Sequence, residues 1–521
     1  MRRRDFLATS GLMLASGLLA ACGGPRPGPI LQTRSGQIQG QLIDGIHQFL
    51  GIPYAQAPYG EYRFKPPQAR AAWQGVFLAD QFGSACEPGS ALESSTVPVG
   101  QDCLNLNIWT PDLGASNLPV MVWVHGGEGD SGSGALPAYN GANLAAQGVV
   151  LVTCNRRLGA EGFLHLQDFG VADAGINVAV LDQIEVLRWV QKHIRVFGGD
   201  PDNITLFGHG EGAALIQALV ATPASDGLLH RVIAQSGSYC AHTPETAQAV
   251  TDAVFEQFAL KTGDVDGLAR ISSAQLAALY PKLQAIAAGR PYRPGISEAM
   301  PVHPADAAHA GFGLALDYLT GSCRDEIIER PAEKDTDWPA QRVKQVLTAG
   351  DVDRQVLLNT YQQQRPELNQ SEGELTMMGD IIYRVPTLRV AQGHALRGAG
   401  STYCYYFIGP SQQQSTRYGQ NIVVFGNPPL QDQSSGGAEA AAAVGAFMRE
   451  AWCNFARTGS PSSDVFAWPQ YDSKQRLTVA IDAEPRVLVA PFPQHRHMLG
   501  RVMTDSWQTW GLKPQNRLGQ N

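Results

Sequence analysis

The sequence carries little charge, and no run of basic residues follows its first few positions. Charged residues make up 17% of the 521 residues, and the formal net charge is −8, from 39 basic and 47 acidic side chains. Nucleic-acid-binding domains cluster Lys and Arg on one surface, so this balance argues against nucleic acid as a partner. Hydrophobic residues make up 44% of the chain, an ordinary share for a globular protein, and no internal repeat or low-complexity block is present.

The eight cysteines include no C-x-x-C pair, so neither a zinc ribbon nor a dithiol redox motif is supported. Cys86 and Cys103 lie close together in polar, turn-rich segments and are the best candidates for a disulfide in an oxidising compartment. Five later cysteines lie in or beside apolar runs and are expected to be buried free thiols: Cys154, Cys240, Cys323, Cys404 and Cys453.

The first residues have the pattern of an export signal. Three arginines at positions 2–4 precede an apolar stretch that is too short for a comfortable membrane span. The segment resembles the twin-arginine signals of bacteria, and "LAAC", ending at Cys22, resembles a lipobox with a lipidated cysteine. We therefore expect an export signal over 1–21, a Gly/Pro tether over 22–29, and anchoring to a membrane through lipid on Cys22. The expected location is the bacterial periplasm or cell envelope.

Strand and helix patterns alternate along the rest of the chain. Apolar runs at "PVMVWV", "VVLVTC", "NITLFG" and "RVIAQ" predict buried strands, and "VAVLDQIEVLRWVQKHIRVFGG" predicts a helix with a glycine stop. Further strands are expected at "LALDYLTGS" and "TYCYYFIG", and a long helix at "EAAAAVGAFMREAWCNFARTG". The alternation predicts an α/β fold with a mostly parallel sheet covered by helices on both faces. We expect one domain over 30–513 and a polar tail over 514–521.

Three of the expected strands end in glycine-rich turns, "HGGEGDSGSG", "GHGEG" and "QSGS". Open α/β sheets bind ligands at the carboxyl ends of their strands, which places the expected site there. The second turn fits both the dinucleotide pattern G-x-G-x-x-A and the hydrolase pattern G-x-S-x-G, with Gly210 in the serine position. The next strand ends at Gln235 without the acidic residue that would hold a ribose, so no nucleotide cofactor is expected.

Many separated motifs, in one order, resemble the type-B carboxylesterase and cholinesterase family of α/β-hydrolases. They are "FLGIPYAQAPYGEYRFKPPQ", "GQDCLNLNIWTPD", "VMVWVHGG", "RRLGAEGFL", "NVAVLDQIEVLRWVQKHIRVFGGDPDNITLFG", "GSCRDE", "VVFGNPP", "NFARTGSP" and "WPQYD". The resemblance covers nearly the whole chain after the tether. It implies an α/β-hydrolase fold with helical insertions, hydrolysis of carboxylic esters by a serine, histidine and acid triad, and no cofactor.

The resemblance places the nucleophile at Gly210, the acid at Glu326 and the base at Arg417. Glycine has no side chain to form an acyl-enzyme. Arg417 is found by counting nine residues back from Gly426, and no histidine occurs anywhere over 395–494. Arginine stays protonated and cannot act as a general base. We hypothesise that Arg417 instead forms an ion pair with Glu326, which would otherwise be an unpaired buried charge.

The expected oxyanion hole is altered as well. Its backbone donors fall at Gly127, Glu128 and Glu211, and His209 precedes the nucleophile position. A carboxylate beside a developing oxyanion raises the barrier unless it points away. His209, Glu128 and Glu211 also suggest a metal site, but a single histidine makes bound metal unexpected.

Four serines on nearby turns are expected to hydrogen-bond those turns rather than replace the nucleophile, because no histidine–acid pair stands beside them in the sequence: Ser131, Ser133, Ser236 and Ser238. We expect an exported lipoprotein that binds a protein or a small molecule without hydrolysing esters. The family includes adhesion proteins, the neuroligins and glutactin, that also lack a working triad. The alternatives are an active carboxylic ester hydrolase with an unconventional site and a carrier that uses the acyl gorge as a pocket.

Overall fold

The structure is a computed structural model that describes residues 24–87, 97–171, 174–287, 289–327, 352–409, 417–427 and 438–506. The expected export signal, Cys22 and the tail over 514–521 lie outside these ranges. Within the ranges, no helix combines the length and the apolar character that a membrane crossing requires.

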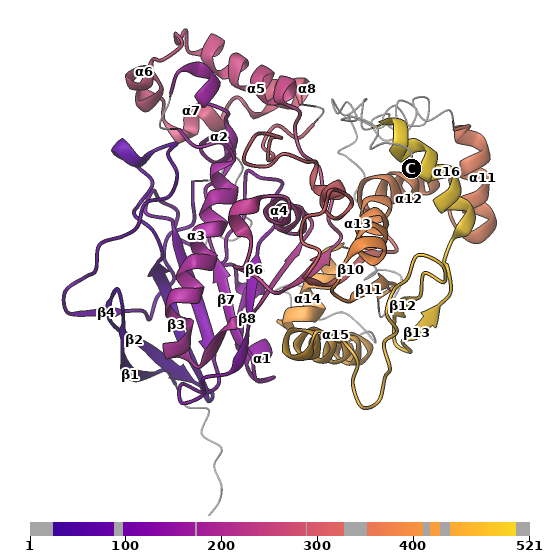
Figure 1. Cartoon of the computed structure of the whole chain (residues 1–521), viewed down its shortest axis with the longest axis horizontal. Helices are drawn as coiled ribbons and strands as arrows, with labels where there is room; N and C mark the ends of the chain where they lie inside the picture. The colour runs from indigo at the N-terminus through magenta and orange to yellow at the C-terminus, as the bar shows by residue number, and fades with distance from the viewer. Residues whose placement is uncertain are drawn as a thin grey trace, which may run out of the picture.

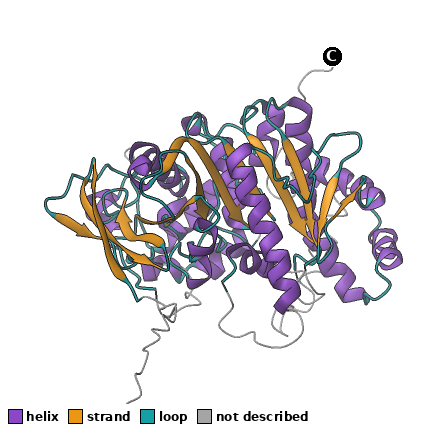
Figure 2. Ribbon diagram, turned by 90° about the horizontal axis from the view of Figure 1, so that it is seen from below, coloured by secondary structure: helices purple, strands orange, loops and turns teal. Residues whose placement is uncertain are grey.

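One twisted sheet of thirteen strands runs through the described residues (Figure 2). Its strand order is β1-β2-β3-β5-β7-β6-β8-β9-β10-β11-β12-β13, with β4 beside β2. All neighbours from β7 to β12 are parallel, and antiparallel strands extend the sheet at both ends. The strands are β1 (Arg26–Thr33), β2 (Gly36–Ile43), β3 (Ile46–Pro53), β4 (Val76–Leu78), β5 (Asn105–Thr110), β6 (Leu118–Val124), β7 (Val150–Cys154), β8 (Gly199–His209), β9 (Arg231–Gln235), β10 (Asp317–Cys323), β11 (Thr402–Phe407), β12 (Thr478–Ile481) and β13 (Arg486–Leu488).

Helices cover both faces of the sheet, and each face has its own apolar core. Side chains alternate along β6, so Val120 and Val122 pack on one face with α3 (Val178–His193) and α4 (Glu211–Val220). Met121 and Trp123 pack on the other face with α14 (Arg417–Phe425) and α15 (Ala438–Thr458). This arrangement confirms the predicted fold class, a mostly parallel sheet between two helical layers.

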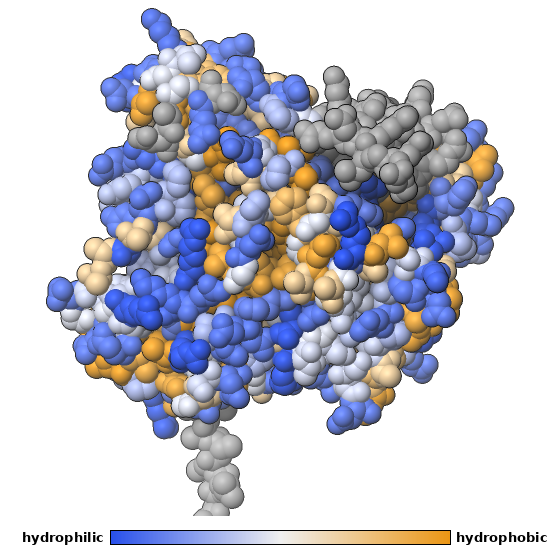
Figure 3. All heavy atoms as spheres, viewed as in Figure 1, coloured by the Kyte–Doolittle hydropathy of each residue, from blue (hydrophilic) through white to orange (hydrophobic). Residues whose placement is uncertain are grey.

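Two groups of inserted helices stand beside the sheet (Figure 1). The first, with its own apolar cluster, comprises α2 (Gly159–Phe163), α5 (Pro244–Gln257), α6 (Val265–Arg270), α7 (Ser273–Ala277) and α8 (Tyr280–Ile286). The second comprises α11 (Arg354–Gln364), α12 (Gln370–Gly379), the π-helical turn Asp380–Arg384, α13 (Val385–Arg397) and α16 (Pro493–Ser506). Two short helices, α1 (Ala142–Ala145) and α9 (Ala307–Ala310), complete the α-helices of the described residues. On the face shown in Figure 3, apolar residues gather between these groups, and polar residues surround them.

The predicted tether is wrong at its C-terminal end. Strand β1 begins at Arg26, and Arg26 and Pro27 pair with Leu42 and Gln41 of β2. The pairing is irregular between Pro27 and Ile30. Proline is tolerated on an edge strand and at a bulge, because a missing N–H there breaks no ladder on the outer side. Composition alone did not show that this Pro-rich stretch has a partner strand.

The cysteines follow the sequence-based expectation with one exception. A disulfide joins Cys86 to Cys103, as predicted. Four other cysteines are buried free thiols, namely Cys154, Cys323, Cys404 and Cys453. Cys240 is half-buried rather than buried, because it lies in the loop that leaves the core after β9, where its thiol donates to the Ser238 carbonyl oxygen at 3.0 Å.

Removal of the disulfide should weaken the fold without abolishing it. The bond closes a loop of 17 residues, and a cross-link of that span contributes about 3 kcal/mol. Both cysteines lie in the core beside α3 and α4, but other side chains make up most of that core and all of the second one. A Cys86→Ser, Cys103→Ser double variant should keep its circular-dichroism spectrum and melt a few degrees lower, whereas the control Cys240→Ser should melt like the wild type. A double variant that lacks the native circular-dichroism spectrum would contradict this prediction.

Candidate functional site

The three glycine-rich turns meet at one edge of the sheet. They follow β6, β8 and β9, whose parallel carboxyl ends lie together. A Cβ on Gly126 would lie 3.2 Å from the His209 carbonyl oxygen and 3.9 Å from the Glu211 nitrogen. The Gly210 N–H donates to the Gln235 carbonyl oxygen at 2.9 Å. The structure therefore brings together the turns that the sequence singled out.

Gly210 occupies a sharp strand-to-helix turn. It follows β8, caps the N-terminus of α4, and has φ 57° and ψ −114°. This backbone conformation is strained for a residue with a side chain and open to glycine. Close packing explains the flanking glycines, because a Cβ on Gly208 would lie 2.9 Å from the Val124 carbonyl oxygen and one on Gly212 would overlap that oxygen. This strand-to-helix turn, which we call the elbow, has the geometry that presents the nucleophile in hydrolases, but its central residue has no side chain.

The loop that contains Gly127 and Glu128, which we call the oxyanion loop, lies directly against the elbow. Gly127 has φ 119° and Glu128 has φ 54°, so both adopt conformations that side chains rarely take. The Ser131 hydroxyl donates to the Gly127 carbonyl oxygen at 3.0 Å and fixes the loop. The Glu128 carboxylate pairs with Arg290 at 3.2 Å, and Arg290 also donates to the Tyr383 hydroxyl at 3.0 Å. An ion pair thus stands at the loop expected to supply backbone donors.

Glu211 is the first residue of α4 and is only 3% exposed. Burial raises the pKa of its carboxyl group, the charge of Arg293 opposes that rise, and the charge of Glu128 adds to it. A carboxylate at a helix N-terminus is favoured by the helix dipole, which helps to explain how this side chain is tolerated. The third expected donor position of the oxyanion hole therefore carries a buried acid, whereas the acid at the second, Glu128, is partly exposed.

Glu326 lies just beyond β10 and is buried, and one carboxylate oxygen accepts from the Cys323 N–H at 2.6 Å. The Cys323 thiol in turn donates to the Gln420 side-chain oxygen of α14 at 3.3 Å. Helix α14, which begins at Arg417, is therefore packed beside the acid position. The Arg417 side chain lies outside the described part of the structure, so its pairing with Glu326 stays a prediction.

His209 contacts a residue that the sequence did not indicate. The Asn421 amide nitrogen of α14 lies 3.0 Å from His209 Nδ1, which acts as the acceptor when the amide donates. Both side chains are buried. Asn421 lies one turn of helix beyond Arg417, and only the packing of α14 against the elbow brings it to the site.

The remaining candidates have structural roles or no shared geometry. The Ser133 hydroxyl donates to Asn155 at 3.0 Å, and the Ser236 hydroxyl lies 3.5 Å from the Cys323 sulfur. Ser238 is buried on the turn after β9. Among the described residues, no group of three or more His, Cys, Asp and Glu side chains is arranged to hold a metal ion.

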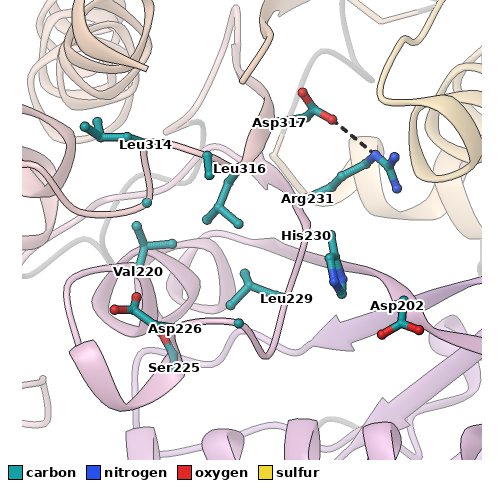
Figure 4. A pocket seen from close by; sticks show the side chains of 13 residues that line it. Asp202, Val220, Ser225, Asp226, Leu229, His230, Arg231, Leu314, Leu316 and Asp317 are labelled. Atoms are coloured by element: carbon teal, nitrogen blue, oxygen red, sulfur yellow. Dashed lines mark ion pairs between the residues drawn. The ribbon is translucent and has the colours of Figure 1, made fainter. Parts of the chain in front are cut away.

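A separate cavity of about 570 Å³ lies at the opposite edge of the sheet (Figure 4). Arg231 and Asp317, the first residues of β9 and β10, form an ion pair of 3.3 Å at its wall. Leu229 and Leu316 supply apolar surface, and Asp226 adds charge. This cavity is at the amino ends of the strands, away from Gly210.

Restoration of a side chain at the elbow should cost stability. Gly210→Ala should lower the free energy of unfolding by about 1–3 kcal/mol, because alanine resists φ 57° with ψ −114°. Gly227→Ala is the matched control, since Gly227 has φ 75° in open space and should cost about 1 kcal/mol. Thermal melts would measure both. A Gly210→Ala variant as stable as the wild type would show that the elbow is not strained.

Asp130 should make stability depend on pH. Burial and the nearby Glu128 charge raise its pKa to about 6. The folded state then holds this proton more tightly than the unfolded state, so its contribution is favourable at low pH and is lost as pH rises from about 4 to 6. Asp130→Asn should therefore stabilise the protein by up to about 3 kcal/mol at pH 7.5 and not at pH 4.

Melting temperatures across that pH range test the Asp130 prediction. Asp226→Asn, an exposed aspartate at the far edge of the sheet, is the control. An equal gain in melting temperature for Asp130→Asn at pH 4 and at pH 7.5 would contradict the prediction.

Known proteins share both the sequence and the fold. The model of the Carboxylesterase family matches residues 27–498. The para-nitrobenzyl esterase of Bacillus subtilis is 32% identical over 490 residues, which cover 90% of this chain and 98% of that protein. A Geobacillus stearothermophilus carboxylesterase structure has a TM-score of 0.79 at 32% identity, covering 90% of this chain and 99% of its own. An esterase structure from Clostridium hathewayi has a TM-score of 0.75 at 26% identity, covering 92% and 100%. On this agreement of sequence and architecture, the chain belongs to the carboxylesterase family.

Proposed function

We propose that this protein is a non-hydrolytic member of the carboxylesterase family that acts by binding. The observation that carries the proposal is Gly210 at the tip of the elbow, where the family's chemistry needs a nucleophilic side chain. The turn keeps the backbone shape that would present a serine, and only the reactive atom is missing. Loss of the nucleophile alone removes the acyl-enzyme route.

The base position supports the same conclusion. Arg417 takes the place expected for histidine, and the stretch from 395 to 494 contains no histidine in which the base could be relocated. A guanidinium stays protonated and cannot take a proton from a nucleophile or from water. A serine elsewhere on these turns would still lack a base from this segment.

The oxyanion position is unfavourable to ester chemistry as well. Glu211 is buried beside the elbow, and Glu128 lies on the facing loop. Removal of a single oxyanion donor costs about 10²–10³ in kcat, and added negative charge acts in the same direction. Three altered elements together favour a binding role over a modified catalytic one.

We further propose that the protein is exported and anchored by lipid on Cys22, on the evidence of the arginines at 2–4 and the "LAAC" segment. A lipid anchor would hold the α/β domain at a membrane of the cell envelope. The partner there is a protein or a small molecule that this scaffold recognises.

The second candidate is an active ester hydrolase with an unconventional site. It is favoured by the relatives, which carry names such as para-nitrobenzyl esterase and phenmedipham hydrolase. Under this candidate, a residue other than Gly210 would supply the nucleophile.

Turnover of a short-chain ester separates the two candidates. Purified protein should hydrolyse p-nitrophenyl butyrate no faster than a heat-denatured control. Hydrolysis well above that control, abolished by a serine-directed phosphonate, would establish the second candidate instead.

Variants at two positions test the base assignment. Gly210→Ser alone should stay inactive, because Arg417 cannot accept the serine proton. Gly210→Ser combined with Arg417→His should exceed the single variant at least tenfold, since a general base contributes about 10²–10⁴ in rate. The folded state of each variant is checked by circular dichroism. Efficient hydrolysis by the single variant would contradict the assignment.

A further inference from the structure

Two arginines beside the elbow are buried with unused donors. Arg156 is 1% exposed; its Nη1 donates to the His125 carbonyl oxygen at 2.9 Å, and its Nε and Nη2 have no hydrogen-bond partner in the described part of the chain. Arg293 is 4% exposed, and within the same ranges neither of its terminal nitrogens has a partner. A buried guanidinium without partners is costly, so such donors favour the binding of an anion.

The charges of both guanidinium groups act on one carboxylate at a helix N-terminus. Arg293 is the strongest charge that acts on Glu211, and Glu211 is the strongest charge that acts on Arg156. Glu211 begins the ten-residue helix α4, whose first N–H groups and dipole favour negative charge. Yet Glu211 forms no ion pair within 4.0 Å with either arginine, and its buried Oε2 atom accepts no hydrogen bond from the described residues. The two guanidinium groups and Glu211 therefore keep hydrogen-bonding capacity that none of the described residues uses.

The neighbouring charges are already matched in pairs. Arg290 is held by Glu128 and by the Tyr383 hydroxyl. Arg157 forms an ion pair of 2.6 Å with Asp182, and both are buried. These pairs leave one carboxylate, Glu211, against two guanidinium groups. The surplus is one positive charge.

Other titratable groups near Arg293 do not change this balance. Burial lowers the pKa of His242 and of His303 to about 3, so both are neutral at pH 7. Asp130 acts on Tyr280 and Tyr292, and it is not among the charges that act most strongly on Glu211, which are those of Arg293, Glu128, Arg156 and Arg290. The surplus charge therefore stays with Arg156 and Arg293.

We propose that Arg156 and Arg293 form a binding site for a small monocarboxylate at the N-terminus of α4. A planar carboxylate matches the fork of a guanidinium, and one negative charge balances the surplus. A phosphate dianion would exceed that balance. This inference rests on the proposed binding function, since it names the ligand class at the same altered site.

Thermal shift and titration calorimetry with sodium butyrate test the site directly, in buffer free of other carboxylates. Butyrate should raise the melting temperature in a saturable way, because a ligand that binds only the folded state stabilises it. Butyramide, a neutral analogue of the same shape, and sodium chloride should not. Absence of a butyrate shift, an equal shift with butyramide, or a shift only with phosphate would each overturn the proposal.

Two variants assign the effect to the arginines. Arg293→Met should weaken butyrate binding at least tenfold, because it removes one of the two guanidinium groups that would bind the carboxylate. Glu211→Gln should strengthen butyrate binding severalfold, because the surplus positive charge grows. Arg231→Met, at the opposite edge of the sheet, is the control and should keep wild-type affinity. A purely structural role for Arg293 predicts a lower melting temperature and unchanged affinity, which would refute the site.

The same preparation separates this inference from the proposed function. Turnover of p-nitrophenyl butyrate would overturn the proposed function, whether or not butyrate raises the melting temperature. No turnover and no butyrate shift would leave the binding role standing and reject only the monocarboxylate site.

Discussion

The backbone of β6 packs directly against the turn that follows β8, and the whole site depends on this contact. The Val124 carbonyl oxygen occupies the space where Gly208 and Gly212 would carry Cβ atoms. Only glycine at both positions lets the two parallel strands end side by side, with α4 starting immediately above them. The contact fixes the conformation of Gly210, the position of Glu211 and the approach of the oxyanion loop. The residue at the elbow tip can therefore change its chemistry without a change in the fold.

Within that fixed geometry, charged side chains occupy or surround the positions that the family resemblance assigns to the oxyanion hole. An oxyanion hole works by uncompensated N–H donors aimed at a developing negative charge. Two of the expected donor positions here are Glu128, which pairs with Arg290, and Glu211, on which the charge of Arg293 acts. Arginine suits such a role, because it remains charged when buried and binds carboxylates through a rigid fork. Side chains of both charge signs are therefore concentrated around the turn at Gly210.

The sheet was predictable from the sequence because its strands are continuous apolar runs between helices, and the elbow because its glycines have fixed spacing. Glu326, Glu128 and Glu211 were likewise placed by motif position. Arg293 was not, since nothing local to "RPYRPG" indicates that it lies near α4, about eighty residues away in sequence. Asn421 was missed for the same reason: its contact with His209 depends on how α14 packs. The first residues of β1, 26–29, were not predicted as strand because their Pro-rich composition is typical of a linker. Their pairing with β2 is visible only in the structure.

Retention of buried arginines has an energetic consequence for this fold. An unpaired buried charge costs several kcal/mol, a large share of a total stability that is typically 5–15 kcal/mol. Two apolar cores on one long sheet can offset such a cost, which a small domain could not. The unbound protein would then be held below its attainable stability by the same groups that make an anion bind. Under the proposed binding role, the affinity for an anion and the stability of the unbound protein are coupled, because the same two guanidinium groups determine both.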